Sequence, residues 1–203
     1  IISDYIVDPP EADKPRRYWL HNKLRSPRGL AFSEDAHLFV MPELALSGYI
    51  FESREEAISL SQTPGGEEFK PVVRMAAERS TTIVLGFAER AGDSLYNSSL
   101  LVAPDGSLSV YRKIQLFGPR ENALYAPGDQ LCVFDFEGRR LGVLICYDVE
   151  FPELARLQAE QQMQILFVPY WTDTKNAYER VRRCAQARAS ATSSLRTASV
   201  PPG

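Results

Sequence analysis

The sequence predicts an α/β fold in which helices cover a mixed β-sheet or a pair of sheets. Short apolar segments alternate along the chain with amphipathic segments of helical period. In the middle of the chain, apolar segments are separated by turn sequences, which indicates hairpins. The chain has 203 residues and no internal repeat, and this length favours a single domain.

Segments rich in β-branched, aromatic and aliphatic residues predict the strands. In chain order they are residues 37–41, 81–88, 96–103, 107–113, 131–136, 141–146 and 164–169. Pro42 follows the first of them and ends it. The turn sequence Pro104-Asp105-Gly106 and the glycine at Gly138 predict two hairpins.

Amphipathic segments predict helices over residues 52–60, 67–79, 150–162 and 174–188. Pro152 is tolerated in the first turn of the third helix, and Thr172 or Asp173 is expected to cap the fourth. Residues 190–203 consist mostly of Ala, Ser, Thr, Arg and Pro. We therefore expect one domain over residues 1–189 and a poorly ordered or truncated tail over 190–203.

Composition and charge exclude several classes of protein. The formal net charge is −3, which argues against a nucleic-acid-binding domain. Residues 14–28 hold six basic residues and no acid, a pattern typical of a solvated face, with an anion or RNA patch as the alternative. No apolar run approaches the ~18 residues of a membrane helix. Residues 1–10 do not resemble a signal peptide, so we expect a cytoplasmic protein.

The sequence lacks the motifs that bind metals, phosphates or common cofactors. It contains two histidines, and its three cysteines, Cys132, Cys146 and Cys184, form no Cys-x-x-Cys pair. Glycine-rich phosphate loops and the Gly-x-Ser-x-Gly elbow of serine hydrolases are also missing. We expect no metal, no cofactor and a reducing environment.

Three predicted strands end abruptly in a polar or reactive residue. These residues are Glu43, Lys113 and Cys146. Because α/β proteins build sites where strands end at one edge of a sheet, the three side chains are candidates for a common site. Each also has a simpler interpretation, as a helix cap, a surface charge and a packed thiol respectively.

The three residue types form a coherent catalytic set. A carboxylate can take the proton of a thiol, and an ammonium can stabilise the oxyanion that forms when the thiolate attacks a carbonyl carbon. The backbone N–H after the cysteine can contribute to the same oxyanion site. The carboxylate can then protonate a leaving amine and activate water. Such a site hydrolyses a C–N bond through a thioester without a metal.

These segments resemble the nitrilase superfamily of carbon–nitrogen hydrolases. The main matching motifs are Pro42-Glu43 with Ser47-Gly48-Tyr49, the run from Tyr111 to Phe117, and Cys146-Tyr147-Asp148 with Phe151-Pro152-Glu153. Lesser matches include Asn97, Ala126-Pro127-Gly128-Asp129, Pro169 with Trp171, and Ala187-Arg188-Ala189. The motifs occur in the family's order over residues 37–189, and the ordered set is specific although each motif alone is weak.

The resemblance implies a four-layer αββα sandwich that forms homodimers or larger oligomers. It implies Glu43 as general base, Lys113 as transition-state stabiliser and Cys146 as nucleophile. Glu121, eight residues after Lys113, matches a second glutamate that positions the substrate and the lysine. Its alternative is an ordinary carboxylate at a helix start.

The residues around the cysteine resemble the amidase and carbamoylase branches, because Tyr147-Asp148 stands where nitrile-cleaving members tend to have Trp-Glu. Glu150 would disfavour a carboxylate substrate if it faced the pocket, or it is a first-turn helix acid. Tyr49, Tyr147 and Trp171 are candidates for an apolar acyl pocket or for plain core. We therefore expect an amidase acting on small primary amides, with no nucleic acid or membrane partner.

Several departures from the family pattern leave alternatives open. Gln115 replaces a histidine that is common after the lysine, and the family's opening strand has only a weak match at residues 1–7. Family members usually continue well past the Ala-Arg-Ala motif, so the sequence is either part of a longer protein or a shortened member that lacks strands at its C-terminus. The alternatives to an amidase are a nitrilase, an N-carbamoyl hydrolase and a catalytically silent oligomeric module.

Overall fold

The computed structural model describes residues 38–136, 138–171, 175–191 and 196–197. The basic segment 14–28, the weak strand match at residues 1–7 and the expected caps Thr172 and Asp173 lie outside the described residues. So does most of the expected tail, whose state remains a prediction. None of the helices in the described part of the chain has the length and apolarity that a bilayer crossing requires.

Two four-stranded sheets form the centre of the molecule. In the first, β1 (Leu38–Val40) pairs in parallel with β2 (Thr82–Ala91), which continues antiparallel to β3 (Ser94–Val102) and β4 (Leu108–Arg112). In the second, β5 (Val133–Phe136) is antiparallel to β6 (Arg139–Val143), and β7 (Ile165–Phe167) and β8 (Arg196–Thr197) follow in parallel. We call them sheet A and sheet B.

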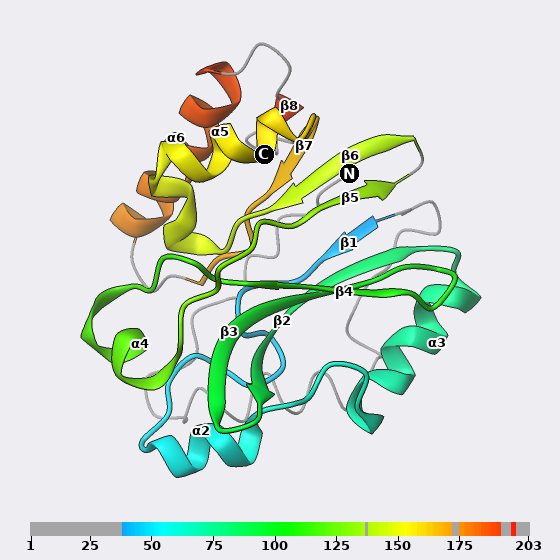
Figure 1. Cartoon of the computed structure of the whole chain (residues 1–203), viewed down its shortest axis with the longest axis vertical. Coiled ribbons are helices and arrows are strands. Elements are labelled where there is room, and N and C mark those ends of the chain that lie inside the picture. The colour runs from blue at the N-terminus through cyan, green and yellow to red at the C-terminus, as the bar shows by residue number, and fades with distance from the viewer. Residues whose placement is uncertain (1–37, 137, 172–174, 192–195, 198–203) are drawn as a thin grey trace.

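Helices cover the outer face of each sheet. The elements α2 (Arg54–Leu60), the 3-10 turn η2 (Glu67–Phe69) and α3 (Lys70–Glu78) lie on the sheet A side, whereas α5 (Pro152–Glu160) and α6 (Lys175–Ala191) lie on the sheet B side (Figure 1). The resulting order is helix, sheet, sheet, helix, which is the four-layer αββα sandwich that was predicted.

The core between the sheets explains why they stack. Val84, Leu101 and Tyr111 of sheet A belong to the same buried cluster as Leu141 and Val143 of sheet B. A second cluster packs η2 and α3 against the opposite face of sheet A, with Phe69 of η2 edge-on to Phe87 of β2 and aliphatic residues around them. Strands buried on both faces read as continuous apolar runs, and residues Thr82–Ala88 are all buried.

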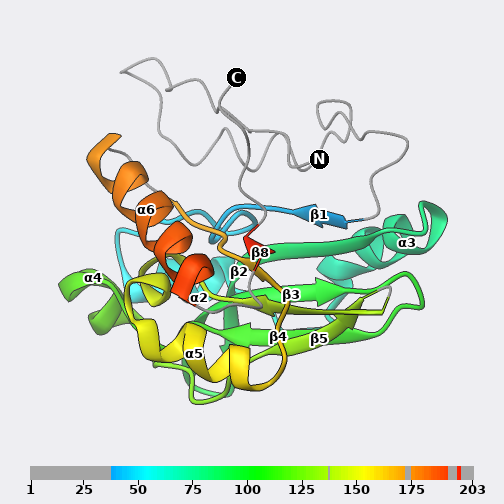
Figure 2. The same ribbon diagram turned by 90° about the horizontal axis from the view of Figure 1, so that it is seen from above.

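Most predicted elements are present, with shifted ends. The hairpin at Pro104-Asp105-Gly106 joins β3 to β4, and the turn at Gly138 joins β5 to β6. The helix predicted over 150–162 is present as α5, and a 3-10 turn, η3 (Cys146–Glu150), precedes it. A short helix, α4 (Gly118–Leu124), was not predicted. It lies at the same end of the molecule as α6, opposite to α3 (Figures 1 and 2).

Candidate active site

Glu43 lies in a tight turn that begins where β1 ends. The residue is only 2% exposed. The turn is held against β2 by main-chain hydrogen bonds from Met41 N–H to Val84 O and from Leu46 N–H to Gly86 O. A Cβ at Gly86 would overlap main-chain atoms on both sides of Glu43. The glycine in β2 therefore permits the close packing that places this carboxylate.

Lys113 follows β4 directly, and its side chain is fully buried. Its N–H donates to Asn97 O and its own carbonyl accepts from Gly128 N–H, both at 2.8 Å. Gly128 approaches the backbone of Arg112 so closely that a Cβ there would overlap the Arg112 carbonyl group. The Ala-Pro-Gly motif thus fixes the backbone of the residue that carries the ammonium.

Glu43, Lys113 and Glu121 form a buried charged cluster. The Lys113 Nζ atom lies 2.7 Å from Glu43 Oε1 and 2.9 Å from Glu121 Oε2. Burial by itself lowers the pKa of Lys113, but the two carboxylates outweigh it and raise the pKa above its ordinary value. Lys113 is therefore a fixed cation between two acids.

Glu121 is held by the first turn of α4 and by a tyrosine from another segment. Its Oε2 accepts from the Phe117 N–H at 2.8 Å, and its Oε1 accepts from the Tyr49 hydroxyl at 2.5 Å. Burial and the nearby Glu121 charge raise the pKa of Tyr49 above its usual value, so the phenol stays a donor. Glu121 and Tyr49, both predicted as site residues, belong to one hydrogen-bonded unit.

Cys146 sits at a sharp turn after β6. Its φ of 48° is unusual for a residue with a side chain, and such strain is often found at functional sites. Main-chain hydrogen bonds hold the turn to the segment after β7, since Leu144 N–H donates to Phe167 O and Cys146 N–H to Pro169 O. The thiol is thereby presented at the end of sheet B.

The charges of the buried cluster act on the Cys146 thiol. Burial is the largest factor that raises the pKa of Cys146, followed by the negative charge of Glu43, and Lys113 acts in the opposite direction. The Cys146 Sγ atom lies 3.9 Å from the Trp171 carbonyl oxygen. The resting group is a thiol beside a carboxylate that can accept its proton.

The aromatic residues predicted to line a pocket take different places. The rings of Tyr49 and Trp171 stack at 4.5 Å, and the main-chain N–H of Trp171 donates to Glu43 Oε2 at 3.1 Å. Tyr147 instead packs edge-on between Phe117 and Phe151. Tyr49 and Trp171 therefore border the charged cluster directly, whereas the Tyr147 ring belongs to an aromatic group beside it.

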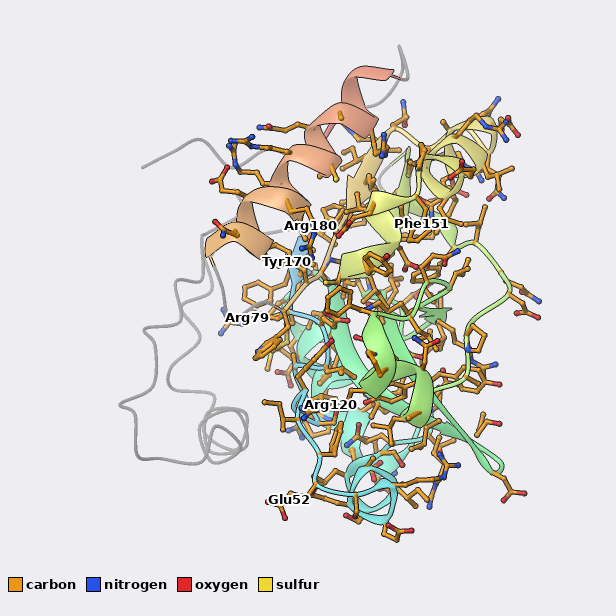
Figure 3. The ribbon with its side chains drawn as sticks, turned by 90° about the vertical axis from the view of Figure 1, so that its left-hand side faces the viewer. Glu52, Arg79, Arg120, Phe151, Tyr170 and Arg180 are labelled. Carbon is orange, nitrogen blue, oxygen red and sulfur yellow. The ribbon has the colours of Figure 1, made fainter. Side chains whose placement is uncertain are left out.

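Glu150 is paired rather than isolated. Its Oε1 accepts from Arg180 Nε of α6 at 2.6 Å, and Arg188 donates to the carbonyls of Val149 and Glu150. Figure 3 shows Arg180 on α6 near Phe151, at the start of α5. The charge of Glu150 is thus compensated from α6, and its predicted contact with substrate remains a prediction.

Two buried polar residues in the site had no role assigned from the sequence. Asn97 of β3 donates from Nδ2 to Glu43 Oε1 at 2.7 Å, and Asp148 accepts four hydrogen bonds close to Cys146 and Lys113. Both were part of the motif set. The sequence did contain one signal for Asn97: a polar residue inside an otherwise apolar strand has to find a hydrogen-bond partner when it is buried.

Glu43 and Lys113 come from sheet A and Cys146 from sheet B, so the site is not one edge of one sheet, as the strand-end argument assumed. A comparison with protein-family models identifies the family of the chain. Residues 11–195 match the model of the carbon-nitrogen hydrolase family. The chain belongs to this family. The four-layer sandwich is therefore the fold of a carbon-nitrogen hydrolase.

Curated carbon-nitrogen hydrolases are similar to this chain over about two thirds of its length. A nitrilase from Pyrococcus abyssi is 42% identical over 68% of the chain and 53% of the relative. An (R)-stereoselective amidase from a Pseudomonas species is 35% identical over 66% of the chain and 48% of the relative. The chain spans about half the length of these curated relatives.

Solved structures of carbon-nitrogen hydrolases share the fold. A superfamily protein from Xanthomonas campestris superposes with a TM-score of 0.73 over 89% of this chain and 69% of its own, at 23% identity, which shows the fold alone. An amidase mutant from Nesterenkonia sp. AN1, 27% identical, superposes with a TM-score of 0.64 over 80% of this chain and 63% of its own. That structure carries the acetamide moiety of fluoroacetamide on its active-site cysteine.

Proposed function

We propose that this carbon-nitrogen hydrolase cleaves small primary amides through a Cys146 thioester, releasing ammonia and a carboxylic acid. The observation that carries the proposal is the buried ion pair of Glu43 Oε1 with the Lys113 ammonium at 2.7 Å, and the charges of both residues act on the pKa of the Cys146 thiol. Base, cation and nucleophile thus meet in one buried place. The similarity to an amidase from a Pseudomonas species supports the same reaction.

In the first half of the reaction, Glu43 takes the Cys146 proton while the sulfur attacks the amide carbon. A raised thiol pKa suits this concerted transfer, because no thiolate has to exist beforehand. The carbonyl oxygen becomes negative, and Lys113 together with the Tyr147 N–H stabilises it. Glu43 then gives the proton to the departing nitrogen, and the C–N bond breaks to leave the thioester.

In the second half, Glu43 activates a water molecule that attacks the thioester. The tetrahedral intermediate again places its negative oxygen near Lys113, and the C–S bond breaks as the proton returns to sulfur. Glu121 keeps Lys113 in place through the 2.9 Å contact, and its second oxygen, bound to the Tyr49 hydroxyl, faces the stacked aromatic pair. Tyr49 and Trp171 are the residues we assign to the acyl side of the site.

The test is ammonia release from acetamide, propionamide and amino acid amides, measured on the protein that carries this chain. Cys146→Ala should remove the release, and Cys132→Ala should leave it unchanged. Full turnover by Cys146→Ala would contradict the proposal. Faster release from the matching nitriles than from the amides would replace it with nitrilase activity, the activity named for the relative from Pyrococcus abyssi.

A further inference from the structure

Asp148 is a fully buried carboxylate two residues after Cys146. Its Oδ1 accepts from the N–H groups of Ile114, at 3.2 Å, and Gln115, at 2.7 Å, which directly follow Lys113. Its Oδ2 accepts from the Ile145 N–H at 2.9 Å and from the Tyr111 hydroxyl at 2.8 Å. One side chain therefore binds the segment of the lysine and the segment of the cysteine.

These two segments belong to different sheets. β4, which leads to Lys113, pairs only with β3 among the described strands, and β6, which leads to Cys146, pairs with β5 and β7. No main-chain ladder of the described residues therefore sets the distance between the ammonium and the thiol. The carboxylate of Asp148 supplies a polar link between the two strand ends, beside the apolar contacts of the core.

Keeping a carboxylate at this place is costly. Burial raises the pKa of Asp148 to about 6, although the Gln115 N–H, the Tyr111 hydroxyl and Lys113 all act to lower it. A neutral asparagine side chain has the same shape and would avoid this cost. It has only one acceptor oxygen, however, whereas hydrogen-bond donors face both oxygens of Asp148. The amino group of an asparagine would face either Ile145 N–H or the N–H groups of Ile114 and Gln115.

We propose that Asp148 is a positioning residue, which sets the separation of Lys113 and Cys146 by binding the backbone on both sides of the gap between the sheets. The inference rests on the proposed function, since it concerns the geometry of the same reaction. Asp148 does not touch the substrate. It acts through the backbone of Ile114, Gln115 and Ile145.

The test compares Asp148→Asn with a matched control, Gln158→Leu. Gln158 is also fully buried, and it donates to the Val143 carbonyl at 2.9 Å, on the same segment as Cys146 but from α5. Because misplacement by about 1 Å costs about 10²-fold in rate, Asp148→Asn should lower kcat by about 10²-fold and change KM by less than about threefold. Gln158→Leu should lower the unfolding temperature while kcat per folded molecule stays within about threefold.

A milder variant covers the case in which Asp148→Asn does not fold. Tyr111→Phe removes one donor to Oδ2 and leaves the other three, so kcat should fall by about three- to tenfold at constant KM. An unchanged kcat in Tyr111→Phe, or equal kcat values in Asp148→Asn and Gln158→Leu, would overturn the proposal.

A substrate-free readout separates this inference from the proposed function. Methyl methanethiosulfonate modifies thiols without needing turnover, and Cys132 serves as the internal reference in the same sample. In Asp148→Asn the rate at Cys146 relative to Cys132 should change by more than about threefold, whereas Gln158→Leu should keep the wild-type ratio. If the wild type releases no ammonia but Asp148→Asn changes the Cys146-to-Cys132 rate ratio, only the proposed amidase activity is refuted. If the wild type is active but Asp148→Asn and Gln158→Leu have the same rate ratio, only the positioning role is refuted.

Discussion

The charged cluster on sheet A and the cysteine turn on sheet B meet in one site, yet their parts are held differently. Glu43, Lys113 and Glu121 are fixed by ion pairs and hydrogen bonds between side chains that are at most 3% exposed. Cys146 is only partly buried and is fixed by its backbone, through a φ of 48° and a hydrogen bond to Pro169. The first half therefore adds buried ion pairs to its main-chain contacts, whereas the position of Cys146 depends on its backbone.

The two halves should differ most in unfolding free energy when the central residue of each, Lys113 or Cys146, is replaced. Lys113→Met leaves two buried carboxylates without their cation, which should cost about 3–5 kcal/mol of unfolding free energy and at least about 10³-fold in turnover. Cys146→Ala should abolish turnover but change stability by less than about 1 kcal/mol. Urea unfolding with ammonia release measures both. Equal stability losses would contradict the proposed difference between the halves.

Glu43→Gln should separate turnover from thiol reactivity. Loss of the base should lower turnover by about 10²- to 10⁴-fold. The negative charge of Glu43 raises the pKa of Cys146, so its removal lowers that pKa and increases the thiolate fraction at a given pH. Modification of Cys146 by methyl methanethiosulfonate at pH 7.5 should therefore become about tenfold faster, since one pKa unit is a factor of ten.

The pH profile of the same modification supplies the control. In the wild type the rate at Cys146 should still rise about tenfold per pH unit between pH 7 and 9, because a raised pKa keeps the group protonated there. Cys132 should react at the same rate in both proteins. A plateau below pH 8 in the wild type would show a resting thiolate, and the concerted transfer to Glu43 would then be wrong.

Two glycines test how each half tolerates added volume. A Cβ at Gly86 meets main-chain atoms of the Glu43 turn, whereas a Cβ at Gly142 of β6 meets the ends of the Met163 and Gln158 side chains. Gly86→Ala should cost about 1–3 kcal/mol and lower kcat by about tenfold because Glu43 moves. Gly142→Ala should cost less, since flexible side chains can shift. Thermal unfolding and kcat compare them, and a larger effect at Gly142 would reverse the ranking.

The smallest effect is expected at the rim of the cysteine half. Glu150→Gln breaks an ion pair with Arg180, whose side chain is 45% exposed, and exposed pairs contribute about 0.2–1 kcal/mol. We expect kcat/KM for neutral amides to change by less than about twofold. If acyl groups bearing a carboxylate become much better substrates, Glu150 faces the pocket after all and contributes to specificity.

Some elements could be predicted from the sequence and others could not, and the difference has a physical reason. β2 and the β3–β4 hairpin were predictable because their apolar runs and the Pro-Asp-Gly turn are local signals. The helix α4 was missed because it has only seven residues and opens with Gly118-Pro119. Its position is decided by Glu121, whose carboxylate binds the Phe117 N–H and Lys113, and such a tertiary contact leaves no periodic pattern.

The motifs predicted the candidate site residues, but they did not predict which side chains bind one another by hydrogen bonds. Glu43, Lys113, Glu121 and Cys146 were all named in advance, and the structure brings them together. The hydrogen bonds of Asn97 and Asp148 were not foreseen, because each links segments more than 30 residues apart. Long-range pairs of this kind depend on how strands are placed, not on their spacing in the chain.

The sequence by itself determined which residues are candidates for the chemistry and that each stands at the end of an apolar strand. Only the tertiary structure decided which of the two stacked sheets each strand joins, since an apolar run indicates burial on both faces but does not indicate which neighbour buries it. The tertiary structure also decided the protonation of Cys146, because a thiol pKa depends on burial and on the charges of Glu43 and Lys113. Those charges come from strands far apart in the sequence and near only in the folded chain.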